Sequence, residues 1–145
     1  MNSNSNNPQI KSFRDLRVYQ NTYQAMLIVM KEITPKLPDS EKFDLRDQLS
    51  RSCKAIPRLI AEGYGKRHQK AGFQKYLDDA MGESNETIVS LEQCRDIYAI
   101  EKELINKLVD TYDMASRQLY KLTIAWSTFK RPLTKPSDDT SIITD

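Results

Sequence analysis

The chain has 145 residues, which is enough for one domain with its own hydrophobic core. Its 22 Lys and Arg residues against 20 Asp and Glu residues give a formal net charge of +2, so total charge gives no reason to expect nucleic-acid binding. Cys53 and Cys94 form no Cys-x-x-Cys motif, and the sequence shows no signal peptide and no long apolar run. We therefore expect two buried thiols in a cytoplasmic protein rather than a secreted or membrane-spanning one.

The first part of the chain predicts a tail and one long helix. Residues 1–11 begin with an Asn- and Ser-rich stretch, and we expect them to be a disordered N-terminal tail. Ser12 and Asp15 have the spacing of a capping box, in which each side chain accepts a hydrogen bond from the other residue's backbone. Apolar residues then recur at helical spacing and predict a helix over 13–33, which Pro35 ends.

The second predicted helix covers residues 44–64. Its core face is marked by apolar residues spaced three and four apart, namely Leu45, Leu49, Cys53, Ile56 and Ile60. Gly63 and Gly65 follow this stripe, and we expect them to end the helix in a left-handed conformation. A basic turn then leads into the next helix.

Two further helices complete the predicted domain. The third covers 71–98, with Gly82 at its middle, where glycine is unfavourable unless another backbone comes close. The fourth covers 101–130, and residues 132–145 are expected to be a flexible C-terminal tail. Long amphipathic helices with short connections predict an all-α, up-down-up-down four-helix bundle over residues 12–131.

The second and third helices carry opposite charges on matching faces. If this pair of helices folds back at its turn, positions whose numbers sum to about 137 lie opposite one another. This register predicts inter-helix salt bridges between Arg51 and Glu86, between Lys54 and Glu83, and between Arg58 and Asp79. Exposed pairs of this kind contribute only ~0–1 kcal/mol each to stability.

The order of the helices also gathers basic residues at one end of the bundle. This end combines the start of the first helix, the turn after the second and the end of the fourth. We call it the basic end, and we predict nucleic-acid contacts for Arg14, Arg17, Lys66, Arg67, His68, Lys70, Lys130 and Arg131. A clustered basic surface is typical of proteins that bind a phosphate backbone. The favourable position of cations at helix C-termini accounts for Lys130 and Arg131 equally well.

No complete catalytic or metal-binding arrangement occurs in the sequence. A row of carboxylates lies on the third helix, but a di-iron bundle needs Glu-x-x-His pairs and His68 is the only histidine. Neither cysteine has a histidine nearby in the sequence to activate it. We predict a protein that is not an enzyme and binds no metal or other cofactor. The tyrosines follow core spacing, which favours packing over base stacking.

These residues together resemble a bacterial family, the proteins encoded in intervening sequences of 23S rRNA genes, over about residues 13–129. The accessory variability determinant of diversity-generating retroelements is a relative of that family. The motifs that carry the resemblance are Phe13-Arg14-Asp15-Leu16, Val18-Tyr19-Gln20, Gln48 with Arg51, Ile56-Pro57, Ile60-Ala61-Glu62-Gly63, Arg67, Phe73, Tyr76-Leu77, Ala80, Gly82 and Glu86. Leu59 and Glu83 stand where the family usually has Asn and Ser.

The resemblance implies a left-handed bundle that assembles as a homopentamer. For the retroelement branch it also implies nucleic-acid binding and a reverse transcriptase as partner. We therefore expect a non-enzymatic oligomer that binds nucleic acid, RNA rather than DNA, through the basic end, within a larger nucleoprotein or reverse transcriptase complex. The alternative is a protein-interaction scaffold that binds no nucleic acid.

Overall fold

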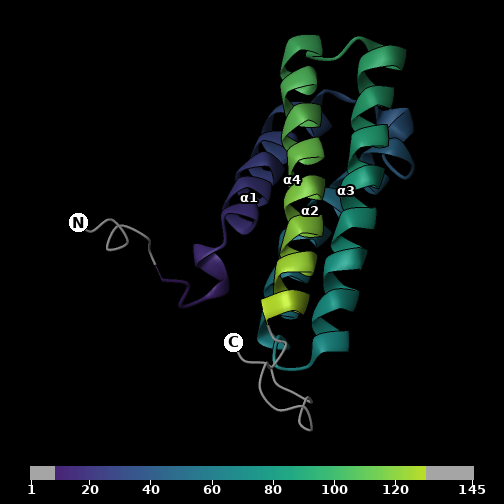
Figure 1. Cartoon of the computed structure of the whole chain (residues 1–145). Helices are drawn as coiled ribbons and strands as arrows, with labels where there is room; N and C mark the ends of the chain where they lie inside the picture. Colours follow the sequence, from purple (N-terminus) through teal and green to yellow (C-terminus); the bar gives the residue numbers. More distant parts are fainter. Residues whose placement is uncertain (1–8, 130–145) are drawn as a thin grey trace, which may run out of the picture.

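The computed structural model describes residues 9–129 of the chain, with side chains up to Trp126. In this range it contains no strand and has the α-helices α1 (Arg17–Ile28), α2 (Leu45–Gly65), α3 (Lys70–Tyr98) and α4 (Lys102–Phe129). The helices alternate in direction, and α1 packs against both α2 and α4 to close the bundle (Figure 1). The predicted all-α four-helix bundle is confirmed. The predicted tails lie almost entirely outside the described residues.

The entry into the bundle differs from the predicted single helix over 13–33. A separate 3₁₀ turn, η2 (Phe13–Asp15), carries the capping box, in which Ser12 Oγ accepts from the Arg14 backbone N–H at 3.0 Å. Leu16 is extended, with φ −74° and ψ 125°, and this interrupts the helix before Arg17. The turn η2 contacts α2, so Phe13 and Arg14 lie on a short segment held beside the bundle.

The connection between α1 and α2 consists of short helical turns. The helix α1 passes into a π-helical segment, η3 (Val29–Ile33), and then into two 3₁₀ turns, η4 (Thr34–Lys36) and η5 (Asp39–Glu41). The sequence predicted η3 as part of the first helix, because Val29 and Ile33 continue its apolar spacing. Both side chains are fully buried in the structure.

The glycines of α2 have a different role from the predicted one. Among the described residues no glycine has a positive φ, so the prediction that Gly63 and Gly65 end the helix in a left-handed conformation is wrong. Gly63 lies inside α2 and is buried, and a Cβ atom added there would lie 2.8 Å from the Cβ of Tyr76 on α3. The missing side chain lets α2 and α3 approach closely. At Gly82 such a Cβ would meet no other described part of the chain within 4 Å, so the close approach predicted there is not made among the described residues.

Candidate nucleic-acid interface

The structure brings the described part of the basic end together. Figure 1 shows η2, the α2–α3 turn and the described end of α4 toward the same end of the bundle, the lower one in this view. Trp126 of α4 is tied to that turn, because its Nε1–H donates to the Arg67 carbonyl at 3.3 Å and its ring centroid lies 4.8 Å from that of Phe73. Lys130 and Arg131 lie outside the described residues.

Several exposed basic side chains at this end make no ion pair among the described residues. Within residues 9–126, no ion pair involves the exposed side chains of Arg14, Arg17, Lys66, His68 or Lys70. Asp15 accepts hydrogen bonds from the backbone N–H groups of Lys11 and Ser12, and these bonds lower the pKa of its carboxyl group. Its carboxylate therefore caps η2 instead of pairing with an arginine.

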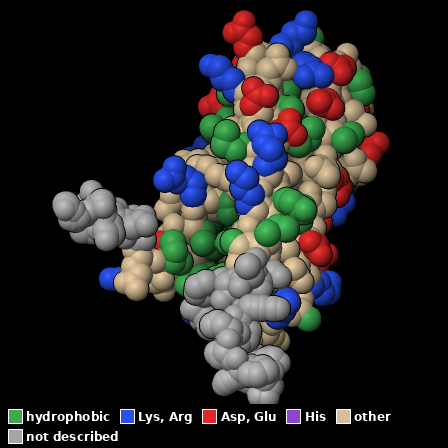
Figure 2. Space-filling view, in the orientation of Figure 1, with side chains coloured by type: hydrophobic (Ala, Val, Ile, Leu, Met, Phe, Trp, Pro, Cys, Tyr) green, Lys and Arg blue, Asp and Glu red, His purple; other side chains and the backbone are tan. Residues whose placement is uncertain are grey.

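The opposite end of the bundle has a different charge arrangement. Ion pairs join Lys36 to Glu101, Arg46 to Asp39 and Arg95 to Asp96. Figure 2 shows basic and acidic side chains interspersed over this end, near the α3–α4 connection. Three cations at this end thus have carboxylate partners, whereas Lys42 and Lys102 form no ion pair within the described residues.

Arg67 has a structural role in the α2–α3 turn. Its guanidinium group lies 4.0 Å from the centroid of the Tyr64 ring, and its Nη1 donates to the Tyr64 carbonyl at 2.8 Å. The side chain is half-buried, and its own carbonyl accepts from Trp126. The sequence did not indicate that Tyr64 and Trp126 hold this turn. Any contact of Arg67 with a ligand would be additional to these bonds.

The same turn leads into a helix end that favours anions. Gln69 at the N-cap of α3 makes no side-chain hydrogen bond to the helix, and the first turn contains no acidic residue. The first N–H groups of a helix have no partner within it, and together with the helix dipole they attract phosphate. Lys66 comes shortly before this helix end and Lys70 is its first residue, and both add positive charge to the same place.

The contact between α2 and α3, called the seam below, has nearly the predicted register, in which the numbers of facing residues sum to about 137. Thr87 Oγ1 lies 2.8 Å from Ser52 Oγ, and the Tyr76 hydroxyl donates to Glu62 at 3.3 Å. Arg51 is close enough to Glu83 for its charge to oppose the rise in the pKa of that carboxyl group, which burial causes.

The ion pairs on this seam run along the helices. Arg51 pairs with Asp47 at 3.0 Å, and Asp79 pairs with Lys75 at 3.0 Å. In the part of the chain that the structure describes, no ion pair joins α2 to α3. The predicted cross-helix pairs, which also include Lys54, Arg58 and Glu86, stay predictions.

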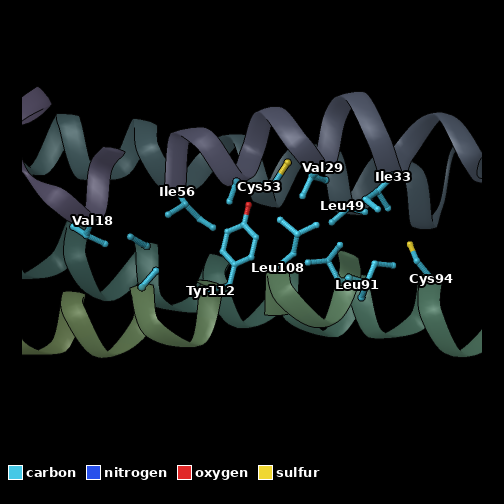
Figure 3. Packing of buried hydrophobic residues seen from close by; sticks show 14 of the residues in the cluster. Val18, Val29, Ile33, Leu49, Cys53, Ile56, Leu91, Cys94, Leu108 and Tyr112 are labelled. Atoms are coloured by element: carbon cyan, nitrogen blue, oxygen red, sulfur yellow. The ribbon is translucent and has the colours of Figure 1, made fainter. Parts of the chain in front are cut away.

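The two cysteines lie in the interior as buried thiols. Cys53 and Cys94 are free and buried, and burial raises the pKa of Cys53 to about 12 and that of Cys94 to about 11. Both thiols are therefore protonated at neutral pH. Figure 3 shows the Tyr112 ring crossing the core with its hydroxyl toward Cys53. Among the described residues no group of three or more His, Cys, Asp or Glu side chains could hold a metal ion.

Comparison with known proteins identifies one family. The family model described as 23S rRNA-intervening sequence protein matches residues 14–121, which include α1, α2, α3 and most of α4. No curated protein matches the chain. The family description names no enzymatic activity. In the described range, no helix has both the length and the apolar content needed to cross a bilayer.

Proposed function

Because this chain belongs to the family of 23S rRNA-intervening sequence proteins, we propose that it is a non-enzymatic RNA-binding bundle that contacts phosphates through the basic end. The observation that carries the proposal is the difference between the two ends. Four cations at the basic end, Arg14, Arg17, Lys66 and Lys70, make no ion pair within the described residues, whereas Lys36, Arg46 and Arg95 at the far end are each paired with a carboxylate. The family description refers to intervening sequences of 23S rRNA, and on that ground we propose RNA rather than DNA as the ligand.

Phosphate contacts explain how such a site works. Each Lys or Arg that neutralises a phosphate releases counterions from the nucleic acid, so affinity falls steeply as salt concentration rises. Contacts of this kind position the protein without reading sequence. Lys66 and Lys70 are the best placed described residues, because they lie beside the uncapped start of α3.

A charge-reversal experiment tests this proposal. Replacing Lys66 and Lys70 with Glu should weaken binding to a labelled RNA stem-loop by about tenfold or more at low salt, because two phosphate contacts become repulsive. Arg67 is left unchanged because it holds the turn. Fluorescence anisotropy measures the affinity, and circular dichroism checks that helix content is unchanged.

The matched control replaces Lys42 and Lys102 with Glu at the far end, where both side chains are exposed. This variant has the same net charge and should bind within about twofold of the unmodified protein. Equal losses in the two variants would contradict the assignment to the basic end. An unmodified protein that does not bind the stem-loop at low salt would favour the alternative, a scaffold that contacts only proteins.

The family resemblance supports assembly as a homopentamer. Gly82 and Val89 are seven residues apart on α3 and share an exposed face, on which Val89 is 52% exposed. A glycine in mid-helix is unfavourable unless a backbone approaches it, and within the described chain none does. A second subunit at this face would supply that backbone.

A reverse transcriptase or another nucleoprotein component is the proposed partner of the assembly. The free thiols of Cys53 and Cys94 suit a complex in the reducing cytoplasm.

Light scattering on a sizing column should give a mass near five protomers. Gly82→Leu should lower this mass, because the new side chain would occupy the place of the neighbouring backbone. Gly65→Leu is the control, since Gly65 is also exposed with nothing within 4 Å. A monomeric unmodified protein at micromolar concentration would contradict the assembly.

A further inference from the structure

A row of aromatic rings begins on η2 and continues along α1. The Phe13 and Tyr19 rings meet edge to face with centroids 4.9 Å apart, and the Tyr19 and Tyr23 rings stack at 5.8 Å with an angle of 30° between their planes. The Arg14 guanidinium lies 4.5 Å from the centroid of Phe13. The row therefore starts beneath a cation of the basic end.

The row is fixed on its inner side and open on its outer side. Tyr19 is half-buried and packs against the core, and Phe13 is half-buried as well. Tyr23 at the end of the row is 40% exposed. Within the described residues, neither tyrosine hydroxyl makes a hydrogen bond, so packing and ring contacts alone orient these rings. The Tyr23 ring is thus held by Tyr19 while part of it stays in contact with solvent.

The charge next to the row matches one class of ligand. Arg14, whose guanidinium lies over Phe13 at the start of the row, is exposed, and in residues 9–126 it forms no ion pair. Proteins that bind single-stranded nucleic acid combine cations along the backbone with aromatic rings on which successive bases stack. A duplex offers phosphates but keeps its bases stacked within the helix, so the rings would have no partner there.

We propose that the preferred ligand of this surface is single-stranded RNA, with an unpaired base stacked on Tyr23 while Arg14 contacts an adjoining phosphate. This proposal rests on the proposed RNA-binding function and specifies the class of RNA. Core spacing favoured packing over base stacking for the tyrosines, and this proposal assigns base stacking to Tyr23. Tyr19 keeps the packing role and holds Tyr23 in place.

The test compares two labelled probes, a 12-nucleotide oligouridylate and a blunt 12-base-pair RNA duplex. Tyr23→Leu removes the ring but keeps an apolar side chain, and it should weaken binding to the oligouridylate by about tenfold, the loss expected for one stacked base. Binding to the duplex should change by less than about twofold, because duplex binding uses phosphates alone. Tyr23→Phe restores the ring and should restore oligouridylate binding.

Tyr120→Leu is the matched control, because Tyr120 lies on α4 and is 59% exposed, outside the aromatic row. It should leave the affinity for both probes unchanged. An unchanged oligouridylate affinity in Tyr23→Leu, or equal losses for both probes, would overturn base stacking while leaving RNA binding intact. A protein that binds neither probe would overturn the proposed function and this inference together.

Discussion

Replacing Tyr112 with Ala should lower the free energy of unfolding by about 3–5 kcal/mol, the loss typical when a large buried aromatic side chain is removed and leaves a cavity. Tyr112 is fully buried, and its ring lies among Ile56, Leu108 and Cys53 at the centre of the core (Figure 3). Urea denaturation followed by circular dichroism, at one fixed protein concentration, measures the change.

The conservative replacement Tyr112→Phe separates the ring from its hydroxyl. Within the described residues the hydroxyl has no hydrogen-bond partner, and burial raises its pKa well above the ordinary value, so it stays protonated. A buried hydroxyl without a partner costs about 1–3 kcal/mol. Tyr112→Phe should therefore be as stable as the original protein or more stable by about 1 kcal/mol. A loss above about 1 kcal/mol would show that the hydroxyl makes a stabilising bond.

The second large effect is expected at Gly63. Replacing it with Val should lower the free energy of unfolding by about 2–3 kcal/mol, because the added atoms overpack the contact between α2 and α3. The nearest obstacle is the Cβ of Tyr76, which cannot turn away without moving the helix backbone. The same urea titration measures this loss.

Gly65→Val provides the control, because it introduces the same side chain two residues away into open space. Its effect should stay within about 0.5 kcal/mol, as for most surface substitutions. Similar losses at the two positions would indicate that valine itself is unfavourable in this part of α2. Close packing at Gly63 would then not be the cause.

The helical period of the sequence predicted much of the fold. The apolar stripe of α2, including Leu49, Ile56 and Ile60, is fully buried as expected. The break at Leu16 was missed, because an apolar residue at the right spacing continues the pattern even where the backbone is extended. Gly63 was misread for a related reason: glycine serves both left-handed helix ends and close helix contacts, and its neighbours in the sequence do not distinguish the two.

The sequence predicted which basic residues lie at one end of the bundle, but not which of them form ion pairs or ring contacts. Helix order alone indicates which cations lie at one end. Only side-chain geometry shows that Lys36 and Arg95 are paired, while Arg14 and Arg17 form no ion pair with the described residues. Arg67 looked equivalent to Lys66 in the sequence, but its half-buried guanidinium stacks on Tyr64. The aromatic row was missed because Tyr19 and Tyr23 lie four residues apart, a spacing that core residues share.

The bundle is long enough that charges at one end have little effect on the electrostatic potential at the other. The helix α3 has 29 residues and therefore spans roughly 43 Å. At physiological ionic strength the Debye length is ~8 Å, so a charge at one end is screened several times over before its field reaches the other. A polyanion at the basic end would respond to the local electrostatic potential and not to the net charge of the whole chain, which is nearly zero. Substitutions that add or remove charge near the α3–α4 connection can therefore accumulate without changing that potential.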